Sequence, residues 1–196
     1  MRSASTASSL VRASRDASDW ITVDSLAHPV GKGVLHEAYR WAELEQLVFS
    51  PSRWERRLVG STIATMPFVD RHRGRAPEVA SRGLALIREL IGDAEPDVQK
   101  ALAWAYRSLA AIDPVATSDA LEAQAELAVA TDDGNRAWVI RDALAKLDPD
   151  VAEGLRARLA GIRRRPGAPP TSAAAATAAD FGGLPDPATH PEPPLA

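Results

Sequence analysis

The chain has 196 residues, 45% of them hydrophobic, which is enough sequence for a single domain with one core. It contains no cysteine, so disulfides, zinc–thiolate sites and thiol catalysis are excluded, and a cytoplasmic location is expected. A formal net charge of −3 and an isoelectric point near 5.8 exclude a protein that holds nucleic acid with its whole surface, so any such binding must come from local basic patches.

The first predicted segments are a leader and a long helical domain. Residues 1–14 are small and polar, so we expect a disordered leader. Over residues 15–165, apolar residues recur at helical spacing, and no stretch shows the alternating pattern of β-strands. The sequence therefore predicts an all-α domain of six to eight helices. The apolar stripes that carry this prediction contain Leu84, Ile87, Leu90 and Ile91; Val98, Ala101, Leu102 and Ala105; Leu121, Ala125 and Ala128; and Ile140, Leu144 and Leu147.

Prolines are expected at the boundaries of these helices, because a proline in the first helical turn loses no hydrogen bond. Six prolines fall between the stripes or in their first turns, namely Pro51, Pro67, Pro77, Pro96, Pro114 and Pro149.

Residues 166–196 are rich in Pro, Ala, Thr and Gly and lack apolar periodicity, so we expect a disordered tail. No apolar run approaches the length of a membrane span, and no membrane contact is expected.

A short pattern recurs within the helical domain. Trp-x-x-Arg begins at Trp54, Trp104 and Trp138, and the second and third copies each run on to an Asp-Pro pair. A helix-pair unit that recurs in this way is typical of an α-solenoid of the HEAT or armadillo kind. In such a stack one helix of each pair lines a concave face, where the pattern places an aromatic ring and a cation one turn apart.

Three motifs follow one another along the chain. Residues 19–24 read Asp-Trp-Ile-Thr-Val-Asp, which places Trp20 and Asp24 on one face of a helix. Residues 54–57 read Trp-Glu-Arg-Arg, and residues 100–107 read Lys-Ala-Leu-Ala-Trp-Ala-Tyr-Arg. In this order they resemble the AlkD-like DNA alkylation repair glycosylases over about residues 18–148. The resemblance implies a superhelix of HEAT-like repeats.

The resemblance also implies roles for individual residues. Asp24 matches the catalytic carboxylate, Trp20 its aromatic neighbour, and Trp104 the second aromatic residue of the site. Arg57 matches the arginine of the DNA-facing helix, and the basic residues expected beside it at the DNA are Arg56, Lys100 and Arg107. The implied partner is double-stranded DNA that carries alkylated bases, and the resemblance implies neither a metal nor a cofactor.

The chemistry agrees with these residue types. A purine alkylated at N3 or N7 is cationic and already a good leaving group, and breaking its glycosidic bond moves positive charge onto the sugar. A fixed carboxylate stabilises that charge and can orient a water molecule. Indole faces attract a nearby cation by roughly 0.5–2 kcal/mol each, and an arginine can hold a phosphate through paired hydrogen bonds.

Plain structural interpretations remain open beside the catalytic one. An acid in a first helical turn, such as Asp24, often does no more than interact with the helix dipole. Packing or solvent exposure alone would account for Trp54, Trp104, Trp138, Arg56 and Arg57. The alternative function is a non-catalytic HEAT-like scaffold that binds DNA or protein.

Two stretches are locally basic. Residues 53–82 hold seven arginines against three acids, and a second cluster precedes the tail, comprising Arg156, Arg158, Arg163, Arg164 and Arg165. Either stretch suits a phosphate backbone, and the second equally suits a solvated helix end before a linker.

The position of the first motif also carries an expectation. In the family the Trp-x-Thr-Val-Asp segment lies near mid-chain after several helices, whereas here it begins at Trp20. The sequence therefore predicts missing N-terminal repeats and a shorter groove. A fragment, a truncated member and one half of an oligomer are the three interpretations.

Overall fold

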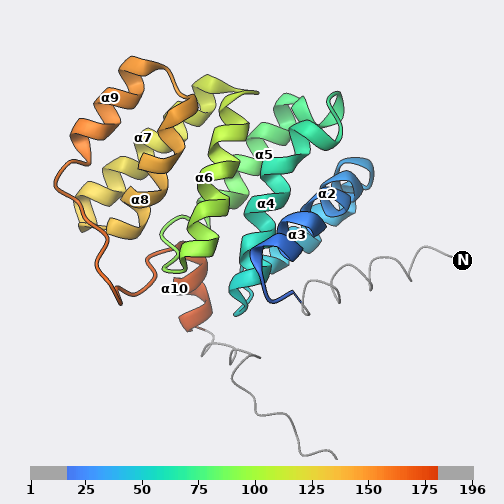
Figure 1. Ribbon diagram of the computed structural model, residues 1–196, viewed down its shortest axis with the longest axis horizontal. Helices are drawn as coiled ribbons and strands as arrows, with labels where there is room; N and C mark the ends of the chain where they lie inside the picture. Colours follow the sequence, from blue (N-terminus) through green and yellow to red (C-terminus); the bar gives the residue numbers. More distant parts are fainter. Residues whose placement is uncertain (1–16, 181–196) are drawn as a thin grey trace, which may run out of the picture.

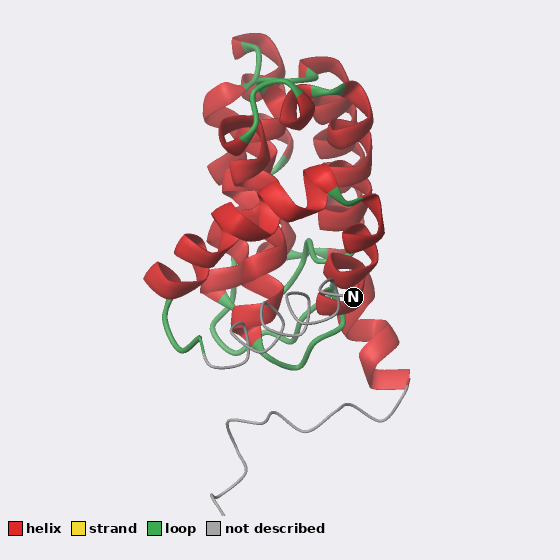
Figure 2. Ribbon diagram, turned by 90° about the vertical axis from the view of Figure 1, so that its right-hand side faces the viewer, coloured by secondary structure: helices red, strands yellow, loops and turns green. Residues whose placement is uncertain are grey.

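The computed structural model describes residues 17–180, and this part of the chain consists of helices joined by turns and loops, with no strand (Figures 1 and 2). Among the described residues, eight α-helices lie between residues 17 and 165 and a ninth follows them, which confirms the all-α class. The α-helices are α2 (Trp20–His36), α3 (Trp41–Leu47), α4 (Arg53–Val69), α5 (Pro77–Arg88), α6 (Pro96–Ala110), α7 (Pro114–Thr131), α8 (Gly134–Ala143), α9 (Pro149–Arg158) and α10 (Ala173–Asp180). Short 3₁₀ turns occur at Ala38–Arg40, Arg73–Arg75 and Leu144–Lys146.

The even-numbered helices α2, α4, α6 and α8 lie side by side in chain order (Figure 1). Helix α5 contacts α4, α6 and α7, and α7 in turn contacts α6, α8 and α9. Sequential helices thus pack as neighbours, each covering an apolar face of the next. Helix α4 occupies the middle of this arrangement, because α2 and α6 pack on opposite sides of it.

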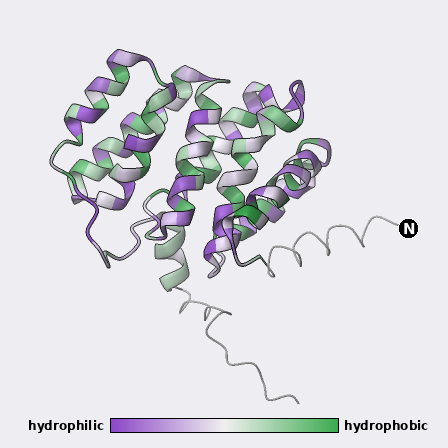
Figure 3. Cartoon of the chain, viewed as in Figure 1, coloured by the Kyte–Doolittle hydropathy of each residue, from purple (hydrophilic) through white to green (hydrophobic). Residues whose placement is uncertain are grey.

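Close contact with its neighbours explains why α4 is almost completely buried from residue 55 to residue 67. A Cβ atom on Gly60 would lie only 3.0 Å from Cβ of Ala101, so the backbones of α4 and α6 approach closely at these small residues. The main core continues through Ile63, Leu102 and Ile140, each fully buried. Elsewhere green and purple segments alternate along the helices in Figure 3, as expected for amphipathic helices with one buried face.

Helix starts agree well with the sequence prediction. Pro77, Pro96, Pro114 and Pro149 each occupy the first turn of a helix, which confirms their predicted placement. The side chain of Asp113 accepts a hydrogen bond from the Ala116 amide at 2.9 Å, so the Asp-Pro pair begins α7 with a capping carboxylate.

The prediction for Pro67 was wrong, because this proline lies inside α4 rather than at a boundary. A proline inside a helix removes one backbone hydrogen bond and costs about 3 kcal/mol. Helix α4 continues past it because packing on both sides outweighs this local cost, and Pro67 itself is buried. Tertiary contacts therefore decide where α4 ends.

The predicted disorder from residue 166 onward was wrong for residues 166–180, which carry α10. The Thr171 amide donates to the Gly92 carbonyl at 2.9 Å, and the Ala174 amide donates to the Glu89 carbonyl at 3.0 Å. Ser172 and Ala174 are buried, and most of α10 is pale green in Figure 3. Small alanines pack closely here, and backbone hydrogen bonds supply the anchoring that apolar periodicity does not reveal. The predicted leader and residues 181–196 lie outside the described residues.

Candidate functional site

Asp24 and Arg57 form a two-point ion pair between α2 and α4. Arg57 donates from Nε to Oδ1 of Asp24 at 3.1 Å and from Nη2 to Oδ2 at 2.7 Å. Such paired hydrogen bonds hold both planar groups in one relative orientation. The sequence placed these two residues in one site, and the structure brings them into direct contact across 33 positions of the chain.

Two further groups complete the arrangement around this ion pair. The hydroxyl of Ser61 donates to Oδ1 of Asp24 at 2.6 Å, and Nη1 of Arg57 donates to the backbone carbonyl of Asp97 at 2.6 Å. Ser61 lies one turn beyond Arg57 on α4, while Asp97 lies in the first turn of α6. Three helices therefore fix the position of one carboxylate.

The two members of the pair differ in their access to solvent. The Arg57 side chain is 7% exposed, whereas the Asp24 side chain is 22% exposed. The charge of Arg57 is thus turned inward and satisfied by protein groups, and the negative end of the pair faces outward. This arrangement can act on a cation that approaches from solvent.

The predicted DNA contact of Arg57 stays a prediction, and the geometry shows which protein groups its side chain binds. Its Nε, Nη1 and Nη2 groups all donate to protein oxygens, and the residue is buried. Nη1 and Nη2 each keep one further N–H, but only 7% of the side chain is exposed to a phosphate in solution. The structure instead gives Arg57 the role of holding Asp24.

The aromatic residues predicted for the site lie in different surroundings. Trp20 is one turn before Asp24 on α2 and is 54% exposed. Trp104 on α6 is half-buried and packs against the main core. Trp54, which was not predicted for the site, has the guanidinium of Arg53 over its ring, 4.7 Å from the ring centre. Only Trp20 therefore presents most of its side chain to solvent beside the carboxylate.

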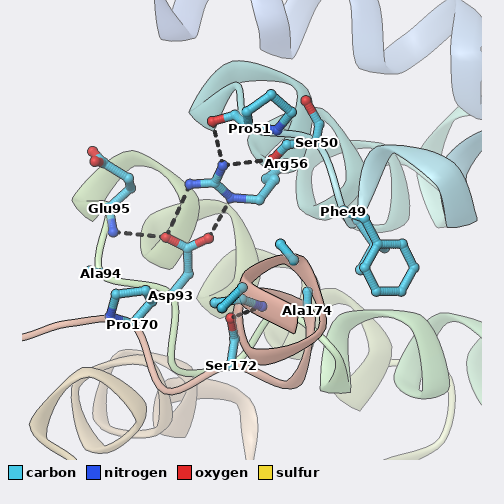
Figure 4. Close-up of a pocket in the computed structure, with 14 residues that line it drawn as sticks. Phe49, Ser50, Pro51, Arg56, Asp93, Ala94, Glu95, Pro170, Ser172 and Ala174 are labelled. Atoms are coloured by element: carbon cyan, nitrogen blue, oxygen red, sulfur yellow. Dashed lines mark hydrogen bonds and ion pairs between the residues drawn. The ribbon is translucent and has the colours of Figure 1, made fainter. Parts of the chain in front are cut away.

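Arg56, for which DNA binding stays a prediction, lies in a separate pocket. Its Nε donates to Oδ2 of Asp93 at 2.7 Å, and its Nη1 donates to the Ser50 and Pro51 carbonyls at 2.8 Å each (Figure 4). The pocket has a volume of about 350 Å³, and α10 forms one wall. Arg56 thus fastens α4 to the loop between α5 and α6.

The remaining two predicted DNA contacts lie on α6. Lys100 is exposed, and no ion pair within the described part of the chain involves it. Arg107 is partly exposed and donates to the Asp142 carboxylate at 2.9 Å and to the Asp142 carbonyl at 2.7 Å, which links α6 to α8. Lys100 is therefore the predicted contact whose charge stays available.

A sequence model of a family described as "DNA alkylation repair enzyme" matches residues 2–147 of the chain. The chain belongs to the DNA alkylation repair enzyme family. This membership covers Trp20, Asp24, Arg57 and Trp104, and it confirms the resemblance proposed from the three motifs. No curated protein and no solved structure matches the chain significantly.

The described residues of this DNA alkylation repair family member contain neither a metal-binding cluster nor a helix that could cross a membrane. Between residues 17 and 180, no group of three or more His, Asp or Glu side chains is arranged to hold a metal ion. Over the same residues, no helix combines the length and the apolarity needed to cross a membrane.

The sequence interpretation did not include Ser61, the Asp97 carbonyl or Asp93. Ser61 could have been noticed, because it follows Arg57 at the spacing that places two residues on one face of a helix. The other two groups come from the chain around the start of α6, whose approach to α4 is visible only in the fold.

Proposed function

We propose that this DNA alkylation repair protein is a glycosylase that hydrolyses the N-glycosidic bond of N3- or N7-alkylated purines in DNA. The observation that carries the proposal is the Asp24 carboxylate, held by Arg57 and Ser61 with its outer edge open to solvent beside exposed Trp20. As the bond between C1′ and the purine nitrogen breaks, its electron pair neutralises the cationic base. Positive charge then develops on the sugar, where a fixed carboxylate stabilises it.

The reaction ends when water adds to C1′ of the sugar and releases one proton to solvent. Asp24 can orient this water through its acceptor atoms, because Oδ2 receives a single protein hydrogen bond and keeps further acceptor capacity. The exposed indole of Trp20 offers an apolar, electron-rich surface for the cationic nucleoside. The chemistry requires neither a metal nor a cofactor.

We propose that the DNA backbone binds along the even-numbered helices. Lys100 supplies an exposed ammonium group on α6, and Arg141 on α8 and Arg163 after α9 supply guanidinium groups. Burial lowers the pKa of the Arg141 guanidinium, and the positive charge of Arg163 acts in the same direction. Three positive side chains on neighbouring segments suit the negative charge of a phosphate backbone.

The fold that we propose for this DNA-binding surface is a HEAT-like solenoid. The neighbour order α2–α4–α6–α8, with α5, α7 and α9 as the second set of helices, supports it. A cytoplasmic location and any assembly of copies also stay predictions.

A non-catalytic scaffold that binds DNA or protein is the second candidate. The observation that favours it is that Arg57 is buried and that all three of its nitrogens donate to protein oxygens, as in a purely structural ion pair. The two candidates differ in one respect that can be measured, which is base release.

The test uses a duplex containing N7-methylguanine or N3-methyladenine and follows free base under single-turnover conditions. We expect Asp24→Asn to lower the release rate by about a hundredfold or more, because it removes a preorganised charge and keeps the shape. Asp132→Asn is the matched control, since Asp132 is an exposed aspartate paired with Arg165, and the rate should not change. A parent protein that binds the duplex and releases no base would establish the scaffold instead.

A further inference from the structure

The hydroxyl of Ser61 makes an unusual contact for a serine inside a helix. Serine in this setting commonly donates to the carbonyl of the residue one turn earlier on its own helix. The Ser61 hydroxyl instead crosses to α2 and donates to Oδ1 of Asp24 at 2.6 Å. Ser61 is completely buried, so no exchange with solvent competes for this hydrogen bond.

The hydrogen bond divides the two carboxylate oxygens of Asp24 into different environments. Oδ1 receives hydrogen bonds from both Ser61 and Nε of Arg57, whereas Oδ2 receives one from Nη2 of Arg57. Oδ2 is therefore the oxygen with more capacity left for a water molecule or for the charge on the sugar. Rotation of the carboxylate would break the contact with Ser61.

We infer that Ser61 is a positioning residue for the reaction, which keeps Oδ1 of Asp24 inward and Oδ2 available to the substrate. This inference rests on the proposed glycosylase function. Ser61 itself is buried and touches no reacting atom, so it acts through Asp24. Its loss should lower the rate of the chemical step and leave the affinity for DNA unchanged.

Thr65 offers a matched control on the same helix. It lies one turn beyond Ser61, is also buried, and its hydroxyl donates to the Ala27 carbonyl of α2 at 3.3 Å and to the Thr62 carbonyl at 3.0 Å. Thr65→Val therefore removes a buried hydroxyl between the same two helices without touching the carboxylate. A purely structural role for such hydroxyl groups would make the two variants behave alike.

The experiment measures single-turnover base release and the dissociation constant for DNA in Ser61→Ala, Ser61→Thr and Thr65→Val. Ser61→Ala should slow release roughly tenfold, the usual size for losing one hydrogen bond to a charged group, with the dissociation constant within about twofold of the parent. Ser61→Thr should restore most of the rate. Equal loss in Ser61→Ala and Thr65→Val, or a loss in DNA affinity alone, would overturn the inference.

A double-mutant cycle gives the second measurement. In an Asp24→Asn background, Ser61→Ala should cause no further loss of rate, because the group it positions has already lost its charge. Independent, multiplying losses would overturn the positioning role.

A structural measurement separates this inference from the proposed function. A crystal structure of Ser61→Ala should show the Asp24 carboxylate turned or split between two conformers, and that of Thr65→Val should show it unchanged. An unmoved carboxylate would overturn the inference whether or not the parent releases base. A parent that releases no base, with the carboxylate turned in Ser61→Ala, would overturn the proposed function alone.

Discussion

Arg56 and Arg57 are consecutive residues of α4, and each pairs with an aspartate from another part of the chain, yet the two pairs are oriented in opposite ways. In the Arg56–Asp93 pair the acid is the buried member, with side-chain exposures of 16% for Arg56 and 4% for Asp93. In the Arg57–Asp24 pair the arginine is the buried member, with exposures of 7% and 22%.

This difference shows what separates a fastening ion pair from a candidate catalytic one. The buried Asp93 carboxylate also accepts a hydrogen bond from the Glu95 amide at 2.8 Å (Figure 4). Its charge therefore interacts with Arg56 and with the loop before α6, and not with molecules in solution. The Asp24 carboxylate keeps an open edge, so its charge is available to a molecule outside. The direction in which the acid faces is therefore the feature that matters.

The largest expected effect on stability comes from breaking the fastening pair. Asp93→Ala should lower the free energy of unfolding by about 3 kcal/mol, because it leaves Arg56 largely buried without its counter-charge. Asp24→Asn should cost less, about 1–2 kcal/mol, since asparagine keeps one acceptor oxygen for Ser61 and Nε of Arg57 at a partly solvated position, although its amide nitrogen cannot accept from Nη2. Urea unfolding followed by circular dichroism measures both. Equal losses in the two variants would remove the distinction between the pairs.

A smaller effect is expected from removing α10, which forms a wall of the Arg56 pocket. Truncation after residue 167 should cost about 2 kcal/mol, because it removes two backbone hydrogen bonds to the α5–α6 region and two buried side chains. The melting temperature should fall by several degrees. Truncation after residue 180 is the control and should leave it unchanged. If both truncations behave alike, α10 contributes nothing to the fold.

The smallest expected effect concerns the salt dependence of DNA binding. Lys100→Ala should reduce the slope of log affinity against log salt by about 0.9, because one phosphate contact is lost. Arg56→Gln should leave the slope unchanged, since the Arg56 guanidinium already donates to Asp93 and to two backbone carbonyls. Fluorescence anisotropy with an undamaged duplex at several salt concentrations measures the slopes. A reduced slope in Arg56→Gln would place DNA at the pocket instead.

Both members of the ion pair were found through the resemblance of three ordered motifs to a known family. Residue spacing by itself showed only that Trp20 and Asp24 share one face of a helix. What spacing could not show was how each arginine is used, because neighbouring positions on a helix point about 100° apart and their partners come from distant segments. Arg57 consequently faces α2, while Arg56 faces the loop before α6.

The sequence by itself determined the all-α class and the helix starts at Pro77, Pro96, Pro114 and Pro149, because periodicity and first-turn chemistry are local properties. Only the tertiary structure decided that α4 continues past Pro67, that residues 173–180 form α10, and that Asp24 rather than Asp93 keeps a partly exposed carboxylate. Each of these three outcomes depends on burial and hydrogen bonds between segments far apart in the chain, which no local pattern records.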